Sequence, residues 1–243
     1  MIIYPAIDLR AGKAVRLVEG DFGRETVFDT DPVDAARRWQ DAGAEWIHLV
    51  DLDGARDGVR ANAAVIERIR ATVDTKLQLG GGMRDLASLA QAHQSGIDRM
   101  VIGSAAVSHP DLVPTAVEAF GPAVAVGIDA RNGLVATRGW TEQTTVSALD
   151  LARTVADQGV GHIIFTDIAR DGRLEGPNLD ALRDLIAATP ACIIASGGVS
   201  ALADIVAIRD VGADGAIIGA ALYHGRIALA DALQVAAGVE GAP

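Results

Sequence analysis

The sequence contains a single cysteine, Cys192, so no disulfide can form within the chain. Aromatic residues make up only 4% of its 243 residues, and 32 acidic residues outnumber 21 basic ones. The net charge of −11 repels nucleic acid and anionic membranes, so we expect neither as a partner. No run of roughly 18 apolar residues occurs, which predicts no transmembrane helix. The first residues are typical of a strand rather than a signal peptide, and these absences together predict a cytoplasmic protein.

Short apolar runs alternate with longer amphipathic segments along the whole chain. Eight apolar runs are typical of parallel strands buried on both faces: residues 2–7, 46–50, 76–79, 99–102, 123–128, 162–166, 191–195 and 215–218. Eight helical patterns follow them: residues 32–42, 62–71, 86–95, 110–119, 146–158, 179–188, 201–211 and 227–237. Asp31-Pro32 predicts a helix cap followed by proline at the first helical position. Residues 18–29 are expected to form a long loop that either closes over a site or has no function.

Eight strand–helix units of similar size favour a closed (β/α)8 TIM barrel, and an open doubly wound sheet is the alternative. A barrel of this kind needs about 250 residues, so residues 1–243 are expected to form one domain. Because a barrel closes its own sheet edges, we expect a monomer.

The two halves of the chain resemble each other at one constant offset. Asp51 and Asp167 stand 116 positions apart, and so do Asn62 and Asn178. The same offset relates Gly81-Gly82 to Gly197-Gly198, and residues 102–106 to residues 218–222. This repetition predicts two (β/α)4 halves with equivalent sites.

Glycine-containing segments follow the third, fourth, seventh and eighth predicted strands. They are Gly80-Gly81-Gly82-Met83-Arg84, Ile102-Gly103-Ser104-Ala105-Ala106, Ala195-Ser196-Gly197-Gly198-Val199 and Ile218-Gly219-Ala220-Ala221-Leu222. Glycine lets the backbone approach an anion, and the N–H groups of a following helix can bind phosphate. Any one of these loops could simply make a tight turn. Their duplication instead favours a phosphate site in each half, and hence a small substrate with two phosphates.

Asp8 and Asp129 end the first predicted strand of each half, at the edge of a barrel that carries chemistry. Such carboxylates can transfer protons if their environment tunes their pKa values. A single aspartate at a strand end could equally cap the chain there or form a salt bridge. Asp51 and Asp167 form a second equivalent pair, and Asp171 is a third candidate.

Four further side chains on predicted loops could contact a substrate. Arg16, Arg84 and Arg138 could bind phosphate or carboxamide, or lie on the surface, and Trp140 could stack on a heterocycle or anchor its loop. The histidines show no metal-ligand spacing, and the sequence has neither a Walker A motif nor a dinucleotide fingerprint, so we expect no metal and no cofactor.

Motifs spread over nearly the whole chain resemble the HisA isomerases of histidine biosynthesis. They are Pro5-Ala6-Ile7-Asp8-Leu9 with Gly12-Lys13, Val15-Arg16-Leu17 and Gly20-Asp21; Leu79-Gly80-Gly81-Gly82-Met83-Arg84; Gly127-Ile128-Asp129-Ala130; Thr166-Asp167-Ile168-Ala169-Arg170-Asp171-Gly172 with Gly176-Pro177-Asn178; and Ala195-Ser196-Gly197-Gly198-Val199. Their order is that of the family.

The resemblance implies an Amadori rearrangement of the aminoaldose ProFAR, which carries two ribosyl phosphates, to the aminoketose PRFAR without a metal or redox cofactor. It implies that Asp8 is the proton acceptor and Asp129 the proton donor, that Asp171 takes the acid role in some relatives, and that Thr166 orients the substrate. The predicted substrate- and phosphate-binding residues are Arg16, Gly20, Gly81, Gly82, Arg84, Gly103, Ser104, Arg138, Trp140, Asp167, Gly172, Gly176, Ser196, Gly197, Gly198, Gly219 and Ala220.

Three alternatives remain at this stage. The sister cyclases, HisF, usually carry Pro-Cys-Leu-Asp where this chain has Pro5-Ala6-Ile7-Asp8. Bifunctional PriA-type isomerases also act on phosphoribosylanthranilate, and Arg138-Gly139-Trp140 resembles their loop, but residues 141–147 lack the PriA pattern. A non-catalytic phosphate-binding barrel would have no need for Asp8 and Asp129.

Overall fold

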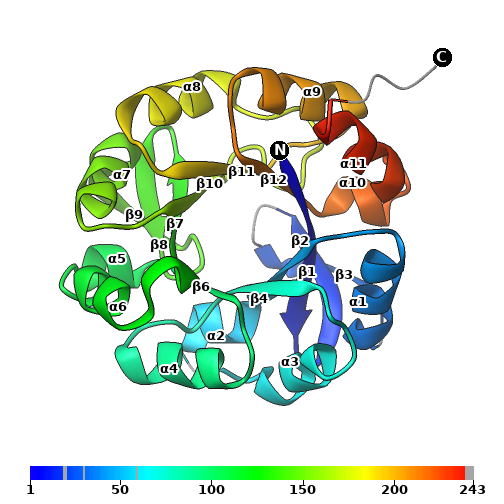
Figure 1. Ribbon diagram of the computed structural model, residues 1–243, viewed down its shortest axis with the longest axis horizontal. Coiled ribbons are helices and arrows are strands. Elements are labelled where there is room, and N and C mark those ends of the chain that lie inside the picture. Colours follow the sequence, from blue (N-terminus) through cyan, green and yellow to red (C-terminus); the bar gives the residue numbers. More distant parts are fainter. Residues whose placement is uncertain (19–20, 30, 59, 239–243) are drawn as a thin grey trace.

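The computed structural model describes residues 1–18, 21–29, 31–58 and 60–238, with the backbone alone for residues 16–18, 21–25 and 27–29. Eight parallel strands form a closed barrel, in the order β1-β4-β5-β6-β7-β10-β11-β12, with β12 pairing back onto β1 (Figure 1). They are β1 (Ile2–Arg10), β4 (Trp46–Asp51), β5 (Lys76–Gly80), β6 (Arg99–Ile102), β7 (Val124–Arg131), β10 (His162–Asp167), β11 (Cys192–Ser196) and β12 (Gly215–Ile218). The predicted (β/α)8 barrel is confirmed.

Eight longer helices occur in the described part of the chain, and helices surround the strand ring (Figure 1). They are α1 (Pro32–Asp41), α3 (Ala63–Arg70), α4 (Leu86–Gln94), α6 (Leu112–Phe120), α7 (Ala148–Asp157), α8 (Leu179–Ala188), α9 (Leu202–Asp210) and α11 (Leu229–Ala236). The predicted start of α1 is confirmed, because Asp31 Oδ1 accepts a hydrogen bond of 3.1 Å from the N–H of Val33. In the part of the chain that is described, no helix has the length and apolar character needed to cross a membrane.

Alternate residues of each barrel strand face two different environments. Leu77 and Leu79 of β5 point outward into the core between strands and helices, where both are fully buried. Burial of such a side chain stabilises the fold by about 1.5–3 kcal/mol. Gln78, between them, faces the barrel interior and is also fully buried. The interior therefore contains polar side chains as well as an apolar cluster built around Tyr4 and Trp46.

Two antiparallel hairpins and four short helices were not predicted from the sequence. The hairpins are β2 (Lys13–Val18) with β3 (Asp21–Asp29), and β8 (Leu134–Thr137) with β9 (Glu142–Ser147). The short helices are α2 (Leu52–Asp57), α5 (Ala105–Ser108), α10 (Ala220–Tyr223) and the 3-10 helix η1 (Gly121–Ala123). The expectation of a long loop at residues 18–29 was wrong, because β3 occupies most of that segment and pairs with β2.

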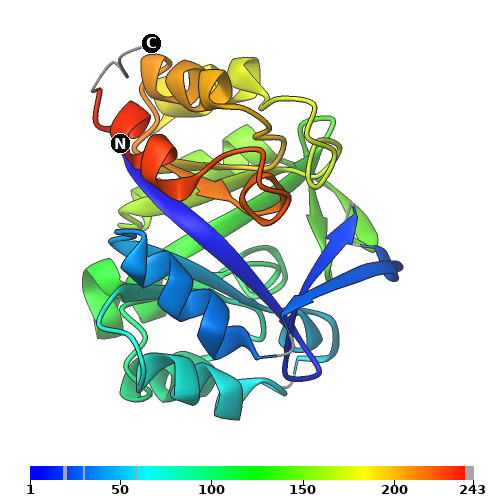
Figure 2. The same ribbon diagram turned by 90° about the vertical axis from the view of Figure 1, so that its right-hand side faces the viewer.

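The two hairpins extend the parallel strands that precede them. β2 pairs with β1, and β8 pairs with β7. Figure 2 shows the β2–β3 hairpin standing out from the side of the barrel at which β1 ends. Because β1 and β7 occupy equivalent places in the two halves, the hairpins follow the same internal repeat as the motifs.

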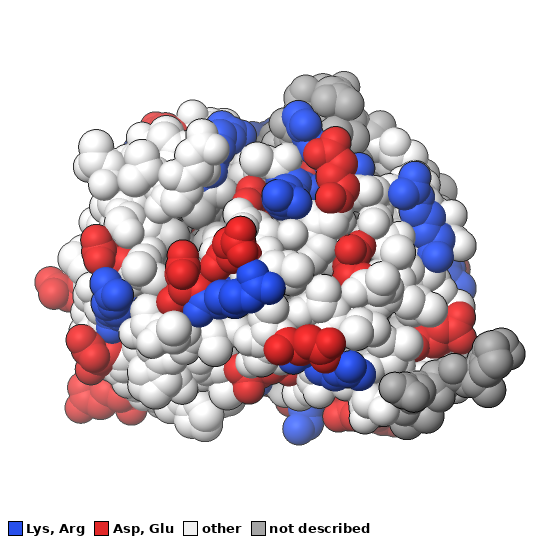
Figure 3. Space-filling view, turned by 90° about the horizontal axis from the view of Figure 1, so that it is seen from above, with Lys and Arg blue, Asp and Glu red and all other residues white. Residues whose placement is uncertain are grey.

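Acidic and basic side chains lie interspersed on the face drawn in Figure 3. Arginine–aspartate ion pairs also occur on exposed helix surfaces of the molecule, such as Arg183 with Asp180 at 2.6 Å. Exposed pairs of this kind contribute less than about 1 kcal/mol each.

Candidate active site

A cavity opens at the carboxyl ends of the barrel strands, and every barrel strand or the loop after it contributes to its lining. This is the face on which barrels of this fold carry their functional groups. Most predicted site residues lie on it: Asp8, Gly81, Gly82, Arg84, Gly103, Ser104, Asp129, Trp140, Thr166, Asp171, Gly172, Ser196, Gly197, Gly198, Gly219 and Ala220. The barrel thus brings together residues that are spread over more than two hundred positions of the sequence.

Five predicted site residues are not among the residues that line this cavity. Arg138, Asp167 and Gly176 are described but lie outside its lining. Arg16 stands on β2 rather than on the predicted loop, and its side chain is outside the described atoms. Gly20 lies outside the described residues altogether.

Asp8 and Asp129 occupy opposite positions in the ring of strands. Asp8 lies near the end of β1, beside Val50 of β4, and Asp129 lies near the end of β7, beside Thr166 of β10. Three barrel strands separate β1 from β7 in either direction around the ring. Because both carboxylates line the same cavity, a small ligand there can have one of them on each side.

Burial raises the pKa of Asp129 above its usual range, and the nearby carboxylate of Asp171 raises it further. Hydrogen bonds from the Trp140 indole and the Thr166 hydroxyl act in the opposite direction, because they stabilise the charged form. Burial is the largest of these influences. A carboxyl group with a raised pKa holds its proton closer to neutral pH, which suits a general acid.

The loop that carries Trp140 has an unusual backbone. Arg138, Gly139 and Trp140 have φ values of 51°, 61° and 71°, so three successive residues are left-handed. The N–H of Arg138 donates a hydrogen bond of 2.9 Å to Ser104 Oγ, which ties this loop to the one after β6. These contacts place the indole against Asp129, an interaction that sequence spacing did not predict.

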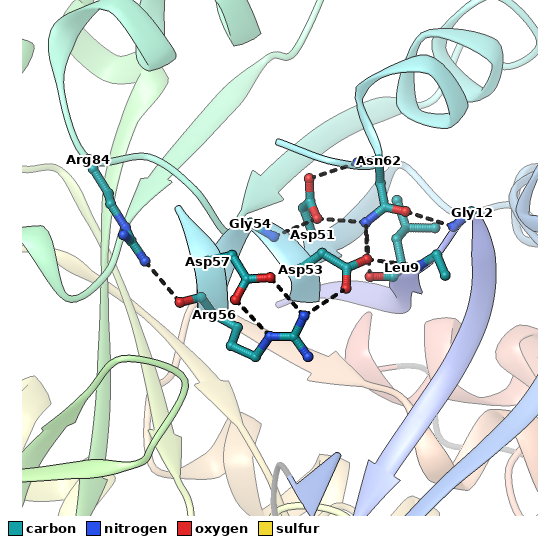
Figure 4. A network of polar contacts seen from close by, with 10 residues as sticks. Leu9, Gly12, Asp51, Asp53, Gly54, Arg56, Asp57, Asn62 and Arg84 are labelled. Atoms are coloured by element: carbon teal, nitrogen blue, oxygen red, sulfur yellow. Dashed lines mark hydrogen bonds and ion pairs between the residues drawn. The ribbon is translucent and has the colours of Figure 1, made fainter. Parts of the chain in front are cut away.

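Asp51 is the centre of a polar network in the first half of the barrel (Figure 4). Its Oδ1 accepts hydrogen bonds from the N–H of Gly54 at 2.9 Å and from Nδ2 of Asn62 at 2.7 Å. Asn62 Oδ1 in turn accepts from the N–H of Gly12 at 2.8 Å, which links the β1–β2 turn to the end of β4. Asp51 is fully buried, so this network fixes backbone positions rather than binding a ligand.

Asp167 makes the matching contacts in the second half. Its Oδ2 accepts from Nδ2 of Asn178 at 2.6 Å, and its Oδ1 accepts from the N–H of Ala169 at 3.0 Å. Asn178 also caps α8 by accepting from the N–H of Ala181. The second pair of equivalent aspartates found in the sequence therefore holds the loops, and Asp167, expected to bind substrate, lies beside the cavity instead.

The glycines of these loops differ in the space that surrounds the position of the missing Cβ atom. A Cβ on Gly81 would clash with the carbonyl oxygen of Asp51. A Cβ on Gly197 would lie only 2.9 Å from the carbonyl oxygen of Asp167. Both glycines also have positive φ. Gly103, by contrast, would meet nothing within 4 Å and has no positive φ. Packing of the protein therefore requires the glycine pairs after β5 and β11, whereas Gly103 leaves open space in the cavity wall.

The loops after β6 and β12 each run into a short helix. Gly219 is the N-cap residue of α10, and Ser104 is that of α5. The first N–H groups of a helix have no partner within it and can donate to an anion. The two loops stand at the equivalent position of each half, so the cavity has one candidate phosphate cradle per half.

His48 is a further polar group on the cavity, although its place in an apolar strand predicts a core histidine. Its Nδ1 lies 2.9 Å from Nε2 of Gln78, and burial lowers the pKa of the ring to about 4. The imidazole is therefore neutral at physiological pH. What distinguishes His48 from an ordinary core histidine is that it lines the cavity.

No group of three or more His, Cys, Asp and Glu side chains that could hold a metal ion occurs among the described residues. The charged and polar side chains that line the cavity are the two opposed carboxylates, Asp171, Thr166, His48, Arg84, Ser104, Ser196 and the indole of Trp140. This set can transfer protons and bind anions.

Comparison with known proteins agrees with this arrangement. The family model for histidine biosynthesis proteins matches residues 2–228. Three relatives carry the name 1-(5-phosphoribosyl)-5-((5-phosphoribosylamino)methylideneamino) imidazole-4-carboxamide isomerase. The protein of Roseobacter denitrificans is 54% identical over 96% of this chain and 98% of its own length. That of Dinoroseobacter shibae is 53% identical over 98% and 100%, and that of a Picosynechococcus strain is 49% identical over 96% and 93%. The chain therefore belongs to the family of histidine biosynthesis proteins.

Proposed function

We propose that this protein is an aldose–ketose isomerase that converts ProFAR, the compound in the names of its relatives, to PRFAR in histidine biosynthesis. The observation that carries the proposal is the pair of opposed carboxylates, Asp8 and Asp129, on one cavity with a candidate phosphate cradle from each half. ProFAR has a phosphate at each end and the reacting sugar between, so its shape matches this layout.

The reaction needs one acid and one base. An acid protonates the furanose ring oxygen, so that the aminoaldose opens to a Schiff base. A base then removes the C2′ proton to give an enolamine, which becomes the aminoketose. We assign the base to Asp8 and the acid to Asp129, because burial raises the pKa of Asp129 and so keeps a proton available. Asp171, beside Asp129, is the alternative acid.

The remaining residues bind and orient the substrate. The loops at Gly103-Ser104 and Gly219-Ala220 hold one phosphate each in this proposal, since their helices offer N–H donors and Gly103 leaves room for an anion. The Thr166 hydroxyl donates a hydrogen bond to the carboxyl group of Asp129 and so helps to hold that group in position. Arg84 lines the same cavity, and its Nη2 lies 3.2 Å from the carbonyl oxygen of Ala55.

A PriA-type activity on phosphoribosylanthranilate is less well supported. Such a substrate has one phosphate and a carboxylate, which an arginine fork would have to draw inward. Arg138, the candidate for that task, is 70% exposed, and its Nη1 lies 3.0 Å from Glu142. The arrangement favours a single substrate with two phosphates.

We further infer that the protein acts as a monomer in the cytoplasm, without nucleic acid or membrane partners. The single cysteine is compatible with a reducing compartment, and the acidic surface disfavours polyanions.

The test is an assay of the purified protein on ProFAR, with Asp8→Asn as the diagnostic variant. The wild-type protein should form PRFAR without added metal or cofactor, and Asp8→Asn should lose about 10²–10⁴-fold in kcat while it still binds substrate. Asp184→Asn serves as a matched control, because Asp184 is exposed on α8 and does not line the cavity. A wild-type protein without activity on ProFAR, or an Asp8→Asn variant within threefold of wild type, would refute the proposal.

A further inference from the structure

Three polar side chains stand next to one another inside the barrel. His48 of β4 pairs in register with Gln78 of β5, and Gln78 pairs with Arg99 of β6. Their exposed fractions are 8%, 0% and 6%, so each depends on its neighbours for hydrogen bonds. His48 lies at the cavity end of this row, and it pairs in register with Ala6, two residues before Asp8 on β1.

Arg99 determines which way the Gln78 amide points. A guanidinium group can only donate hydrogen bonds, so the atom of Gln78 that lies 3.1 Å from Arg99 Nη1 must be the amide oxygen. Arg99 is itself held in place, because Nη1 also donates to the Tyr4 hydroxyl at 3.1 Å and its guanidinium lies 4.3 Å from the centre of the Trp46 ring. The amide nitrogen of Gln78 therefore faces His48.

The orientation of Gln78 then determines the tautomer of His48. An amide nitrogen only donates, so His48 Nδ1, at 2.9 Å, must accept and cannot carry the hydrogen. In a neutral imidazole the hydrogen is then on Nε2. Since Nδ1 is occupied by Gln78, Nε2–H is the polar group that His48 can offer to the cavity it lines.

We propose that Arg99 and Gln78 are positioning residues, which fix His48 as an uncharged Nε2–H donor to an oxygen of the substrate's sugar. The proposal rests on the proposed function for the identity of the sugar, but the tautomer follows from the hydrogen bonds alone. An uncharged donor suits this place, because it can orient a sugar oxygen without taking the proton that Asp8 is to remove.

Nitrogen-15 NMR of histidine-labelled protein tests the tautomer without any substrate. Of the five histidines, the His48 signals are identified by their loss in His48→Gln. In the wild type we expect Nε2 to carry a hydrogen and Nδ1 to carry none. Gln78→Glu keeps the size and the bond from Arg99 but replaces the donor with an acceptor, so it should place a hydrogen on Nδ1.

Two variants of Arg99 test whether it acts through Gln78. Arg99→Lys still offers only donors and should keep the wild-type nitrogen pattern of His48. Arg99→Met lets the Gln78 amide turn, so both tautomers should be populated. Because these spectra are recorded on the free protein, they remain informative even if Gln78→Glu does not fold.

Kinetics on ProFAR test the link to the substrate. Gln78→Glu should lower kcat/KM by about tenfold to a hundredfold, the usual effect of losing one well-placed hydrogen bond. Arg99→Met should cause a smaller loss, in proportion to the fraction of His48 that leaves the Nε2–H tautomer. Cys192→Ala, on β11 of the same barrel, is the matched control and should change neither the spectra nor kcat/KM.

A hydrogen on Nδ1 in the wild type would overturn the proposal, and so would an altered tautomer with unchanged kcat/KM. A wild-type protein that is inactive on ProFAR would instead refute the proposed function, and the spectra would still decide the tautomer.

Discussion

The indole N–H of Trp140 donates a hydrogen bond to the carboxylate of Asp129. The two residues belong to different segments, since Asp129 lies on β7 and Trp140 lies in the turn between β8 and β9. Burial raises the pKa of Asp129, and the Trp140 bond partly offsets that rise because it stabilises the charged form. Trp140 therefore adjusts the pH at which the proposed acid gives up its proton.

Trp140→Phe removes this bond and keeps an aromatic ring. The pKa of Asp129 should rise further, because the loss of a donor disfavours the carboxylate. If Asp129 acts in its protonated form, the alkaline limb of kcat/KM against pH should move to higher pH. A limb that moves to lower pH would contradict the role assigned to Asp129.

Asp171→Asn distinguishes the two candidate acids. If Asp129 is the acid, removal of the neighbouring negative charge lowers the pKa of Asp129, and the alkaline limb moves to lower pH with kcat largely kept. If Asp171 is the acid, kcat should fall by about 10²–10⁴-fold instead. Asp129→Asn, measured beside it, should show the larger loss of kcat if the present assignment is correct.

Gly197→Ala should destabilise the fold through a backbone clash. Gly197 has φ +89°, and an added Cβ would lie 2.9 Å from the carbonyl oxygen of Asp167. Gly212→Ala is the matched control, because Gly212 has φ +92° and nothing within 4 Å of its missing Cβ. In urea denaturation Gly212→Ala should cost about 1 kcal/mol for its backbone conformation, and Gly197→Ala at least about 1 kcal/mol more. Equal losses would show that the contact with Asp167 carries no cost.

His48 should make the folded state less stable in mildly acidic solution. Burial lowers its pKa from 6.5 to about 4, so between these values the unfolded chain binds a proton that the folded protein does not. The free energy of unfolding therefore falls as the pH drops through this window, by up to about 3 kcal/mol from this residue. The difference between wild type and His48→Gln in urea denaturation at a series of pH values isolates this effect. A difference that does not change between pH 7 and pH 4 would contradict the burial of a neutral ring.

Substrate selectivity tests the choice between one substrate and two. We expect kcat/KM on phosphoribosylanthranilate to be at least about a hundredfold below that on ProFAR, or roughly 2.7 kcal/mol in transition-state stabilisation. The reasons are the sequence of residues 141–147 and the pairing of Arg138 with Glu142. Comparable efficiencies on both substrates would establish a PriA-type enzyme and leave the role of Asp8 unaffected.

Much of the barrel could be predicted because its pattern is local. The strands at β6 and β12 and the helix α8 were predicted at the bounds observed, and the other main elements were predicted to within a few residues. The hairpins were missed because each pairs with the end of a preceding barrel strand. Their sequences, such as Asp21–Asp29, show no strict alternation that would mark a strand.

The sequence by itself determined the number of strand–helix units, the repeat at a constant offset and the presence of Asp8 and Asp129 at strand ends, because these depend on residues close together in the chain. Barrel closure alone decided what each group touches. It placed Arg99 against Tyr4, 95 positions away, and it brought Asp51 and Asp167 to the asparagines that hold the neighbouring loops. It also set Trp140 on Asp129 and turned His48 toward the cavity. Contacts of this kind depend on the order and stagger of distant strands, which spacing along the chain does not record.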